Sequence, residues 1–282
     1  MASQVASARS QAPERRGRIL PKGWPDFLLQ LLLFAAVDLA YEASRTFAKG
    51  DVAAAFIHAR NVVSIERAFG IFNEVNVQEW TLNHGWALDV ANWTYFHAHF
   101  GVTTVFMFWL YLRRNKHYYF IRNIVFASMA IALAGYIVFP TAPPRMLTDL
   151  GFIDTLEKFS GVNHDSTAVL ALSNPFAAVP SVHTCFSLII GTSCFLLVRN
   201  RYVRVAWLFY PCLIVFSIVA TANHFWLDAI LGACVALLAF GLAWLLERSR
   251  PTLPESARRR LHMEPPASAR ARATTPRTTP SP

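Results

Sequence analysis

Six long stretches of mostly apolar residues limit this chain to one kind of fold. They are residues 25–43, 93–112, 121–140, 182–198, 204–222 and 226–246. A helix needs about 20 mostly apolar residues to cross the hydrocarbon core of a bilayer, and each stretch approaches or reaches that length. The first is the weakest, because Asp38 and Glu42 interrupt it. We therefore predict an all-α protein, a polytopic integral membrane helical bundle with six transmembrane helices.

Composition and charge point the same way. Only 15% of the 282 residues are charged and 54% are hydrophobic, whereas soluble domains carry about a quarter charged residues. The net charge of +9 gathers near the two ends and in two short connections, and a soluble nucleic-acid binder would spread it over its fold. We expect the membrane as a partner and no nucleic acid. The four cysteines lie in apolar runs without CxxC spacing, which predicts buried packing residues.

The distribution of positive charge predicts the orientation in the membrane. The connection at 113–122 has four basic residues and no acidic one, and that at 199–204 has three and none. The long connections at 43–91 and 141–180 contain more acidic than basic residues. Basic connections stay on the cytoplasmic side. We therefore predict a multi-pass protein of the cell membrane, with both termini in the cytoplasm and the long connections outside.

The domain organisation follows from these segments. Residues 23–248 are predicted to form one six-helix membrane domain. A disordered basic tail is predicted at 1–22 and a disordered tail rich in Pro and Arg at 249–282. Apolar residues recur at helical spacing through residues 53–72, which predicts an amphipathic helix on the outer surface.

Three short stretches with reactive side chains fall at the predicted outer ends of the helices. Residues 139–145 read Phe-Pro-Thr-Ala-Pro-Pro-Arg, residues 179–183 read Val-Pro-Ser-Val-His, and residues 223–228 read Asn-His-Phe-Trp-Leu-Asp. They are far apart in the sequence, yet the predicted topology brings them to one depth of the membrane. We therefore expect them to form a single site.

The residue types in these stretches suit phosphoryl transfer. His224 and Asp228 are four residues apart, on one face of a helix, so the carboxylate can keep one imidazole nitrogen protonated and leave the other free to attack. Arg145 offers guanidinium donors to phosphate oxygens. Ser181 can cap a helix whose first amides could bind an anion. His183 would stand beside the phosphate, able to protonate a leaving oxygen.

The three stretches resemble the signature motifs of the type 2 phosphatidic acid phosphatase superfamily. The second motif there is Pro-Ser-Gly-His and here is Pro-Ser-Val-His, and the third ends His-x-x-x-Asp in both. The resemblance covers about residues 25–246. It implies His224 as the nucleophile, Asp228 as its orienter and His183 as the acid for the leaving group. It also implies metal-free chemistry without a cofactor, on a phospholipid or another lipid phosphate.

Two positions depart from the family pattern. Counting back from Arg145, the expected Lys is Val138, and the Arg expected six residues before His224 is Ile218. Two of the three cationic phosphate ligands of the family are therefore missing.

The form of the first and third stretches narrows the resemblance. Thr-Ala-Pro-Pro-Arg and Ala-Thr-Ala-Asn-His resemble the branch that includes the inositol phosphorylceramide synthases, which transfers a phosphoryl headgroup from one lipid to another acceptor. Asn223 is predicted to bind substrate phosphate, and Thr221, Arg60 and Arg67 are further candidates to replace the missing cations. Glu66 is predicted to pair with Arg67 or Arg60.

The prediction is thus a lipid phosphotransferase or lipid phosphate phosphatase, working through a phosphohistidine at the outer membrane face. One alternative is a divalent metal held by His183, His224 and Asp228, although the nearby arginine would repel it. Another is a non-catalytic transporter or scaffold that uses the same polar pocket, although only Asp38 lies well inside a predicted helix. A hydrolase built on Ser181 lacks the Gly-x-Ser-x-Gly elbow.

Overall fold

The computed structural model describes residues 20–48, 52–160 and 176–249. Within these ranges the chain is helical with connecting turns, and its only β-type pairing is an isolated bridge between Thr141 and Ala177. The all-α prediction is therefore confirmed. Most of the two predicted tails, residues 1–19 and 250–282, lies outside the described residues.

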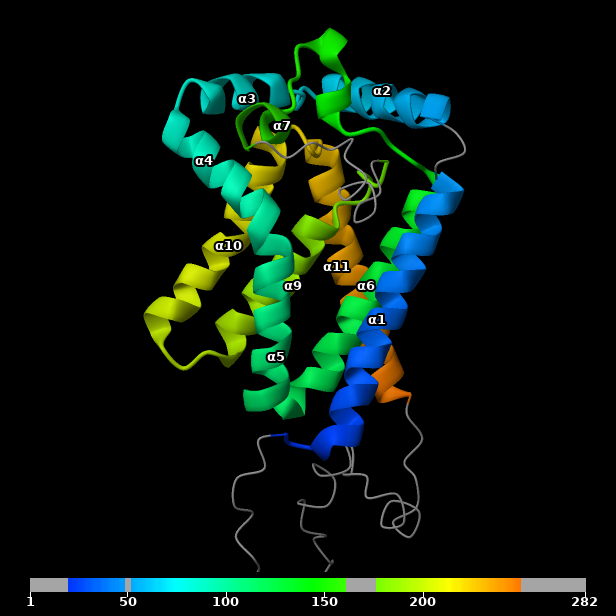
Figure 1. Cartoon of the computed structure of the whole chain (residues 1–282), viewed down its shortest axis with the longest axis vertical. Helices are drawn as coiled ribbons and strands as arrows, with labels where there is room; N and C mark the ends of the chain where they lie inside the picture. The colour runs from blue at the N-terminus through cyan, green and yellow to red at the C-terminus, as the bar shows by residue number, and fades with distance from the viewer. Residues whose placement is uncertain (1–19, 49–51, 161–175, 250–282) are drawn as a thin grey trace, which may run out of the picture.

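Six apolar helices form the body of the molecule (Figure 1). They are α1 (Gly23–Ala48), α5 (Thr103–Arg113), α6 (Asn115–Val138), α9 (Val182–Leu197), α10 (Arg201–Ala220) and α11 (Trp226–Arg248). Four of the described helices contain a span long and apolar enough to cross a membrane, namely Gly23–Tyr41 within α1 and the whole of α6, α10 and α11. Two more, Phe100–Arg113 and Val182–Leu197, are apolar but shorter. The chain is an integral membrane helical bundle.

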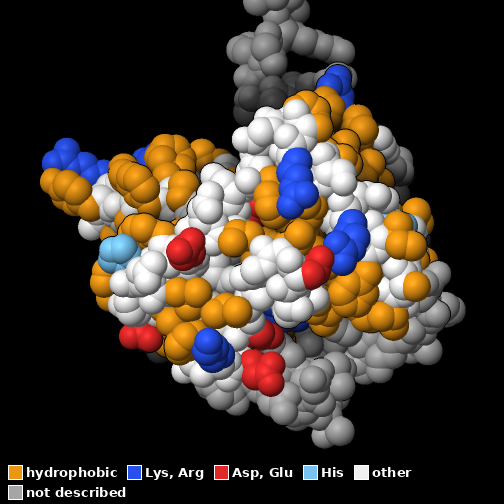
Figure 2. Space-filling model, turned by 90° about the horizontal axis from the view of Figure 1, so that it is seen from above, with side chains coloured by type: hydrophobic (Ala, Val, Ile, Leu, Met, Phe, Trp, Pro, Cys, Tyr) orange, Lys and Arg blue, Asp and Glu red, His pale blue; other side chains and the backbone are white. Residues whose placement is uncertain are grey.

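Short helices cover one end of this bundle. They are α2 (Val52–Ala68), α3 (Glu74–Leu82), the 3-10 turns η2 (Pro144–Met146) and η3 (Thr148–Leu150), and α7 (Thr155–Ser160). From this end α4 (Gly85–Trp93) descends and continues through the π-helix η1 (Thr94–Val102) into α5 (Figure 1). Figure 1 shows α2 lying across the end of the bundle, which confirms the helix predicted at 53–72. We call this the capped end. Hydrophobic side chains on its surface are interspersed with separate acidic and basic ones (Figure 2).

The opposite end carries the basic connections. There α1 begins, α11 ends, and the turns from α5 to α6 and from α9 to α10 are made (Figure 1). The predicted grouping of basic connections at one end is therefore what the structure has. That this end faces the cytoplasm stays a prediction.

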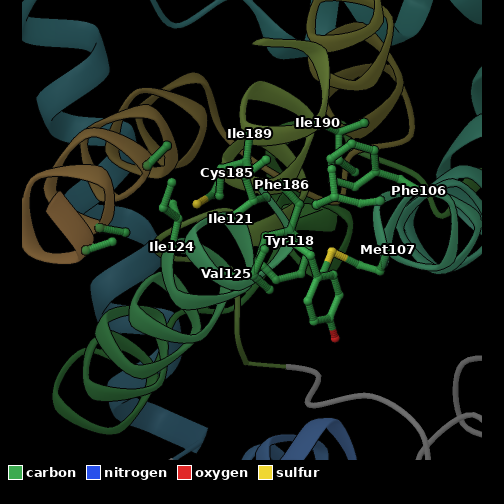
Figure 3. Packing of buried hydrophobic residues seen from close by; sticks show 14 of the residues in the cluster. Phe106, Met107, Tyr118, Ile121, Ile124, Val125, Cys185, Phe186, Ile189 and Ile190 are labelled. Atoms are coloured by element: carbon green, nitrogen blue, oxygen red, sulfur yellow. The ribbon is translucent and has the colours of Figure 1, made fainter. Parts of the chain in front are cut away.

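A cluster of buried side chains holds α5, α6 and α9 together (Figure 3). Its labelled members are Phe106 and Met107 from α5, Tyr118, Ile121, Ile124 and Val125 from α6, and Cys185, Phe186, Ile189 and Ile190 from α9. Cys185 and Cys194 are buried, as predicted. Cys212 and Cys234 are exposed on the outside of the bundle, so the prediction of four buried cysteines is wrong for these two. An apolar run does not show which of its faces points inward.

Candidate active site

The three predicted stretches meet at the capped end, and backbone hydrogen bonds join them. The amide of Arg145 donates to the carbonyl of Ala222 at 2.8 Å, which fixes the first stretch to the turn before α11. The amide of Ser181 donates to the carbonyl of Asp228 at 3.0 Å, which fixes the start of α9 to the first turn of α11. Segments that are distant in sequence thus form one rigid frame.

Two histidines and an aspartate form a hydrogen-bonded chain at this junction. His224 Nδ1 lies 3.3 Å from Asp228 Oδ2, and His224 Nε2 lies 3.2 Å from His183 Nδ1. Asp228 is fully buried and His224 is 4% exposed, so water does not compete for these contacts. The proximity predicted for the three side chains is present in the structure.

The partners of His224 determine where its proton sits. Nδ1 faces two acceptors, the carbonyl of Ala178 at 3.0 Å and the carboxylate of Asp228 at 3.3 Å. Neither can donate while Asp228 is ionised, so the proton belongs on Nδ1 and the lone pair on Nε2. His183 Nδ1 must then supply the proton of the hydrogen bond between the two rings. This network leaves His224 Nε2 unprotonated, with a free lone pair that faces His183.

His183 is held by the start of α9 and by an aromatic ring. Ser181 is the N-cap of this helix, and its hydroxyl accepts from the amide of Thr184 at 3.4 Å, so the predicted cap is confirmed. Tyr95 in η1 stacks on the His183 ring with centroids 5.1 Å apart and planes 22° apart. Nothing in the sequence singled out Tyr95, because the contact depends on how the 93–112 segment packs.

Arg145 is joined to Asn223, the residue before His224, and is fixed by two side chains. Its guanidinium donates to Asn223 Oδ1, and its Nε lies 3.2 Å from Asp154 Oδ2. The amide nitrogen of Asn223 in turn donates to Thr221 Oγ1 at 2.8 Å. The predicted phosphate ligand Asn223 therefore orients Arg145 in this structure, and both of its polar atoms are engaged. The Arg145 side chain is only 10% exposed.

The two positions at which the family pattern has a cationic residue carry apolar side chains in this structure. Val138 ends α6 and is exposed on the outside of the bundle, and Ile218 is fully buried. Of the two outer arginines, Arg60 pairs with Asp149 at 3.0 Å on the exposed surface, and Arg67 lies over the Phe72 ring. Both already have partners away from the histidines.

The prediction that Glu66 pairs with Arg60 or Arg67 is wrong. Glu66 is fully buried on the inner face of α2, and its carboxyl oxygen accepts from the amide of Leu227 at 2.7 Å. The fully buried Glu74 lies beside it and accepts from the amide of Trp226 at 3.2 Å. The helical face of α2 that carries Glu66 points into the protein, whereas both arginines lie on its outer side.

Two cavities flank the site. One of about 520 Å³ lies next to Arg145 and is lined in part by charged side chains; its lining is Arg145, Met146, Thr148, Phe152, Ile153, Asp154, Glu157 and Lys158. The other, of about 830 Å³, is lined almost wholly by apolar side chains, among them Trp80, Leu188, Phe216, Trp226 and Ile230, and it reaches Thr184 beside His183. The polar cavity thus meets the site at Arg145, and the apolar cavity meets it at Thr184.

The alternative sites are less well formed. In the described part of the chain, no group of three or more His, Cys, Asp or Glu residues is placed to hold a metal ion. Asp228, His224 and His183 form a line, with His224 in the middle, and do not converge on one point. Asp38, the residue that suggested a transport path, is exposed on α1.

The fold is an all-α membrane bundle, and the site is a pair of histidines where the ends of its helices meet. These features define a class of membrane enzymes, and comparison with known proteins identifies the class. The profile of the PAP2 superfamily matches residues 60–242, and the chain belongs to this superfamily. It is a membrane enzyme that acts on lipid phosphates. The phosphoinositol dihydroceramide synthase of Bacteroides thetaiotaomicron is 24% identical over 228 residues, which cover 74% of each chain. No solved structure matches.

Proposed function

We propose that this protein transfers a phosphoryl group, with the headgroup it carries, from a donor lipid to an acceptor hydroxyl through a phosphohistidine at His224. The observation that carries the proposal is the chain from Asp228 through His224 to His183, with Arg145 held by Asn223, the residue before His224. A carboxylate, a nucleophilic imidazole, a second imidazole and a guanidinium are the groups that such a transfer needs without a metal.

The proposed reaction has two steps. His224 Nε2 attacks phosphorus, the bond from phosphorus to the oxygen of the leaving alcohol breaks, and His183 protonates that oxygen. An acceptor hydroxyl then attacks the phosphohistidine, His183 takes its proton, and the nitrogen–phosphorus bond breaks to restore His224. Asp228 stabilises the positive charge that the His224 ring acquires when Nε2 is bonded. Arg145 and the first amides of α9 stabilise the charge on the phosphoryl oxygens.

The hydrogen bond between the two histidines must open for this reaction. In the structure His183 Nδ1 occupies the lone-pair direction of His224 Nε2 at 3.2 Å. A reacting phosphorus has to lie about 3–3.5 Å from Nε2 along that same direction. Substrate must therefore displace the His183 N–H, which then turns toward an oxygen of the phosphate. The observed arrangement is the resting state of a nucleophile and its acid.

The two cavities suit the two halves of a phospholipid. The charged cavity next to Arg145 and Lys158 fits a polar headgroup or a hydroxylated acceptor. The apolar cavity reaches Thr184, the neighbour of His183, and runs along α10 and α11, so an acyl chain can lie there with its phosphate at the histidines. Phosphorus would then sit at His224, between Arg145 of the charged cavity and Thr184 of the apolar one.

Product analysis with purified protein tests the function. A panel of phospholipids is supplied with and without a long-chain lipid alcohol or a polyol as acceptor, in excess chelator. We expect a new phosphodiester lipid that needs the acceptor and persists in chelator. Release of the phosphorylated headgroup into water whether or not an acceptor is present would instead establish a hydrolase. Activity that chelator abolishes would contradict the metal-free mechanism.

The Asp228→Asn variant tests the role of charge behind the nucleophile. The side-chain oxygen that accepts from His224 and from the amide of Phe225 at 2.9 Å is kept. The carbonyl of Ala178 still holds the proton on Nδ1. Because the tautomer survives, we expect kcat to fall about 100-fold, less than the ~10⁴-fold loss seen when the tautomer is also wrong. Steady-state kinetics measures this, and an unchanged kcat would remove Asp228 from the mechanism.

The proposed location of the site is the outer face of the cell membrane. In a chain lacking Cys212 and Cys234, a cysteine replaces Asn83 at the capped end or His117 at the basic end, both exposed. A membrane-impermeant maleimide applied to intact cells is expected to label the Asn83→Cys chain alone. Labelling of only the His117→Cys chain would reverse the orientation and place the site in the cytoplasm.

A further inference from the structure

The first turn of α11, which carries Asp228, is capped by two other helices. The N-cap residue, Phe225, has no side-chain acceptor to offer the free amides that begin a helix. Instead the amide of Trp226 donates to Glu74 Oε1 at 3.2 Å, and that of Leu227 donates to Glu66 Oε1 at 2.7 Å. The start of the helix behind the nucleophile is thus fixed by carboxyl groups of α3 and α2.

One proton shared between the two glutamates explains how they can lie together. Both are fully buried, and Glu66 Oε2 and Glu74 Oε2 contact no N–H donor within the described part of the chain. Burial, together with the Glu74 carboxyl beside it, raises the pKa of Glu66 to about 9. With that pKa Glu66 keeps its proton at neutral pH, and the neighbouring Glu74 carboxyl is the acceptor we assign to it. The pair then carries one negative charge, which suits the positive end of a helix.

The same first turn of α11 positions the nucleophile, His224. Asp228 Oδ2 accepts from the amide of Phe225 at 2.9 Å and faces His224 Nδ1 at 3.3 Å. Any shift of the first turn of α11 moves Asp228 and with it the direction of His224 Nε2. A mispositioning of about 1 Å can cost a factor of 100 in rate.

We propose that Glu66 and Glu74 are positioning residues of the reaction, a proton-sharing carboxyl pair that holds α11 so that Asp228 aims His224 at phosphorus. The inference rests on the function proposed above. The charged groups that face the pair are Asp228 from α11 and, within the pair, the carboxyl of the other helix. On α2 itself, Arg60 and Arg67 have their partners elsewhere, on Asp149 and on the Phe72 ring. Among the described residues, no cation therefore replaces the shared proton.

Substitution by glutamine separates the shared proton from the shared charge. In Glu66→Gln the amide oxygen still accepts from Leu227 and the amide nitrogen donates to Glu74, so one negative charge remains. In Glu74→Gln the roles are exchanged: the new amide nitrogen donates to Glu66, and one negative charge again remains. With both glutamates replaced, the caps remain but the charge is gone. Glu66→Ala removes the cap itself. The exposed Glu79 of α3 gives the matched control Glu79→Gln.

The pair also predicts a dependence on pH. Above about pH 9 Glu66 loses its proton, and three carboxylates then surround the first turn of α11. A phosphodiester with a nitrophenyl leaving group reports this directly, because that group leaves without a proton from His183. We expect the rate of the unmodified protein to fall above about pH 9, and that of Glu66→Gln to hold.

The kinetic experiment compares kcat and KM of these variants at pH 7 and across the alkaline range. Each single glutamine variant and Glu79→Gln are expected within about threefold of the unmodified kcat. The double glutamine variant and Glu66→Ala are expected to lose at least about tenfold in kcat, with KM changed less than about threefold. Full kcat in the double variant, or an alkaline loss that Glu66→Gln shares, would overturn the inference.

Thermal unfolding in detergent tests the pair without any turnover. The folded protein holds a proton on Glu66 that the unfolded chain releases near pH 4.5, so folding stability should fall as pH rises from about 4.5 to about 9. Glu66→Gln has no such proton and should show a flatter dependence. An equal slope in both proteins contradicts the shared proton. Absence of turnover on any phosphoester, with the expected difference in slope, would overturn the proposed function while the pair itself stands.

Discussion

Replacement of His224 by alanine is expected to abolish the covalent phosphoenzyme and reduce kcat to background. In the structure two acceptors face His224 Nδ1 and hold the ring proton there, so Nε2 carries no proton. His183→Ala is expected to behave differently. It removes the proton for the leaving oxygen and leaves the nucleophile in place, so a nitrophenyl ester should be turned over far better than a natural lipid.

Rapid-quench trapping of acid-labile phosphohistidine with labelled substrate distinguishes the two roles. We expect label in the unmodified protein and in His183→Ala with the nitrophenyl ester, and none in His224→Ala. The exposed His84 and His97 stack on neighbouring tryptophans and serve as controls, since His84→Ala and His97→Ala should retain label and rate. Label that survives in His224→Ala and disappears in His183→Ala would exchange the two assignments.

The opposite protonation states of the two histidines also predict a bell-shaped pH–rate profile on natural lipids. His224 must be neutral to attack, and His183 must carry a proton for the leaving oxygen. With the nitrophenyl ester, the alkaline limb that reports loss of the proton from His183 should disappear. The limb due to Glu66 should remain, because it acts through α11 and not through the leaving group.

The residues brought together at the site could be predicted because each was tied to a helix end. Apolar runs give the helices, and reactive side chains at three helix ends on one side converge once the helices pack antiparallel. His224 and Asp228 were placed together by helical spacing alone. The contacts of Tyr95 and Asp154 could not be found this way, because they depend on η1 and on the loop after η3, whose paths no periodicity predicts.

The burial of Glu66 had a sequence signal that the interpretation missed. The buried residues of α2 are Ala55, Ala59, Val62, Val63 and Glu66. Their spacing follows one face of a helix, so the glutamate stands in an otherwise apolar stripe. A carboxyl in that position has to find buried partners, and pairing with a surface arginine was the wrong expectation.

The lengths of the helices were harder to predict than their existence. The helix expected at 121–140 begins at Asn115, within the basic connection, because charged side chains at a helix end can remain in the interface. The helix expected at 93–112 is formed by two consecutive elements, the π-helix η1 and then α5, and it continues upstream into α4, which ends at Trp93. Hydropathy measures how apolar a segment is and does not register a change in helical hydrogen bonding.

Replacement of Gly232 by alanine is expected to have the largest effect of any substitution outside the histidines. A Cβ at this position would collide with the backbone carbonyl of Ser181 and would lie 3.2 Å from Thr184 Cβ. The obstacle is backbone, so no side-chain rotation relieves it, and the start of α9 must move away from α11. That movement breaks the hydrogen bond from the Ser181 amide to the Asp228 carbonyl and separates His183 from His224.

Gly241, two and a half turns further along α11, provides the matched control, because nothing lies within 4 Å of a Cβ built there. Alanine is favoured over glycine inside a helix by about 1 kcal/mol, so Gly241→Ala should leave kcat unchanged and raise the thermal midpoint slightly. Gly232→Ala gains the same helical preference but incurs overpacking of about 1–3 kcal/mol. We expect its thermal midpoint to fall and kcat to drop at least about 100-fold. Two variants with the same midpoint and rate would show that the close approach of α9 to α11 does not set the distance between the two histidines.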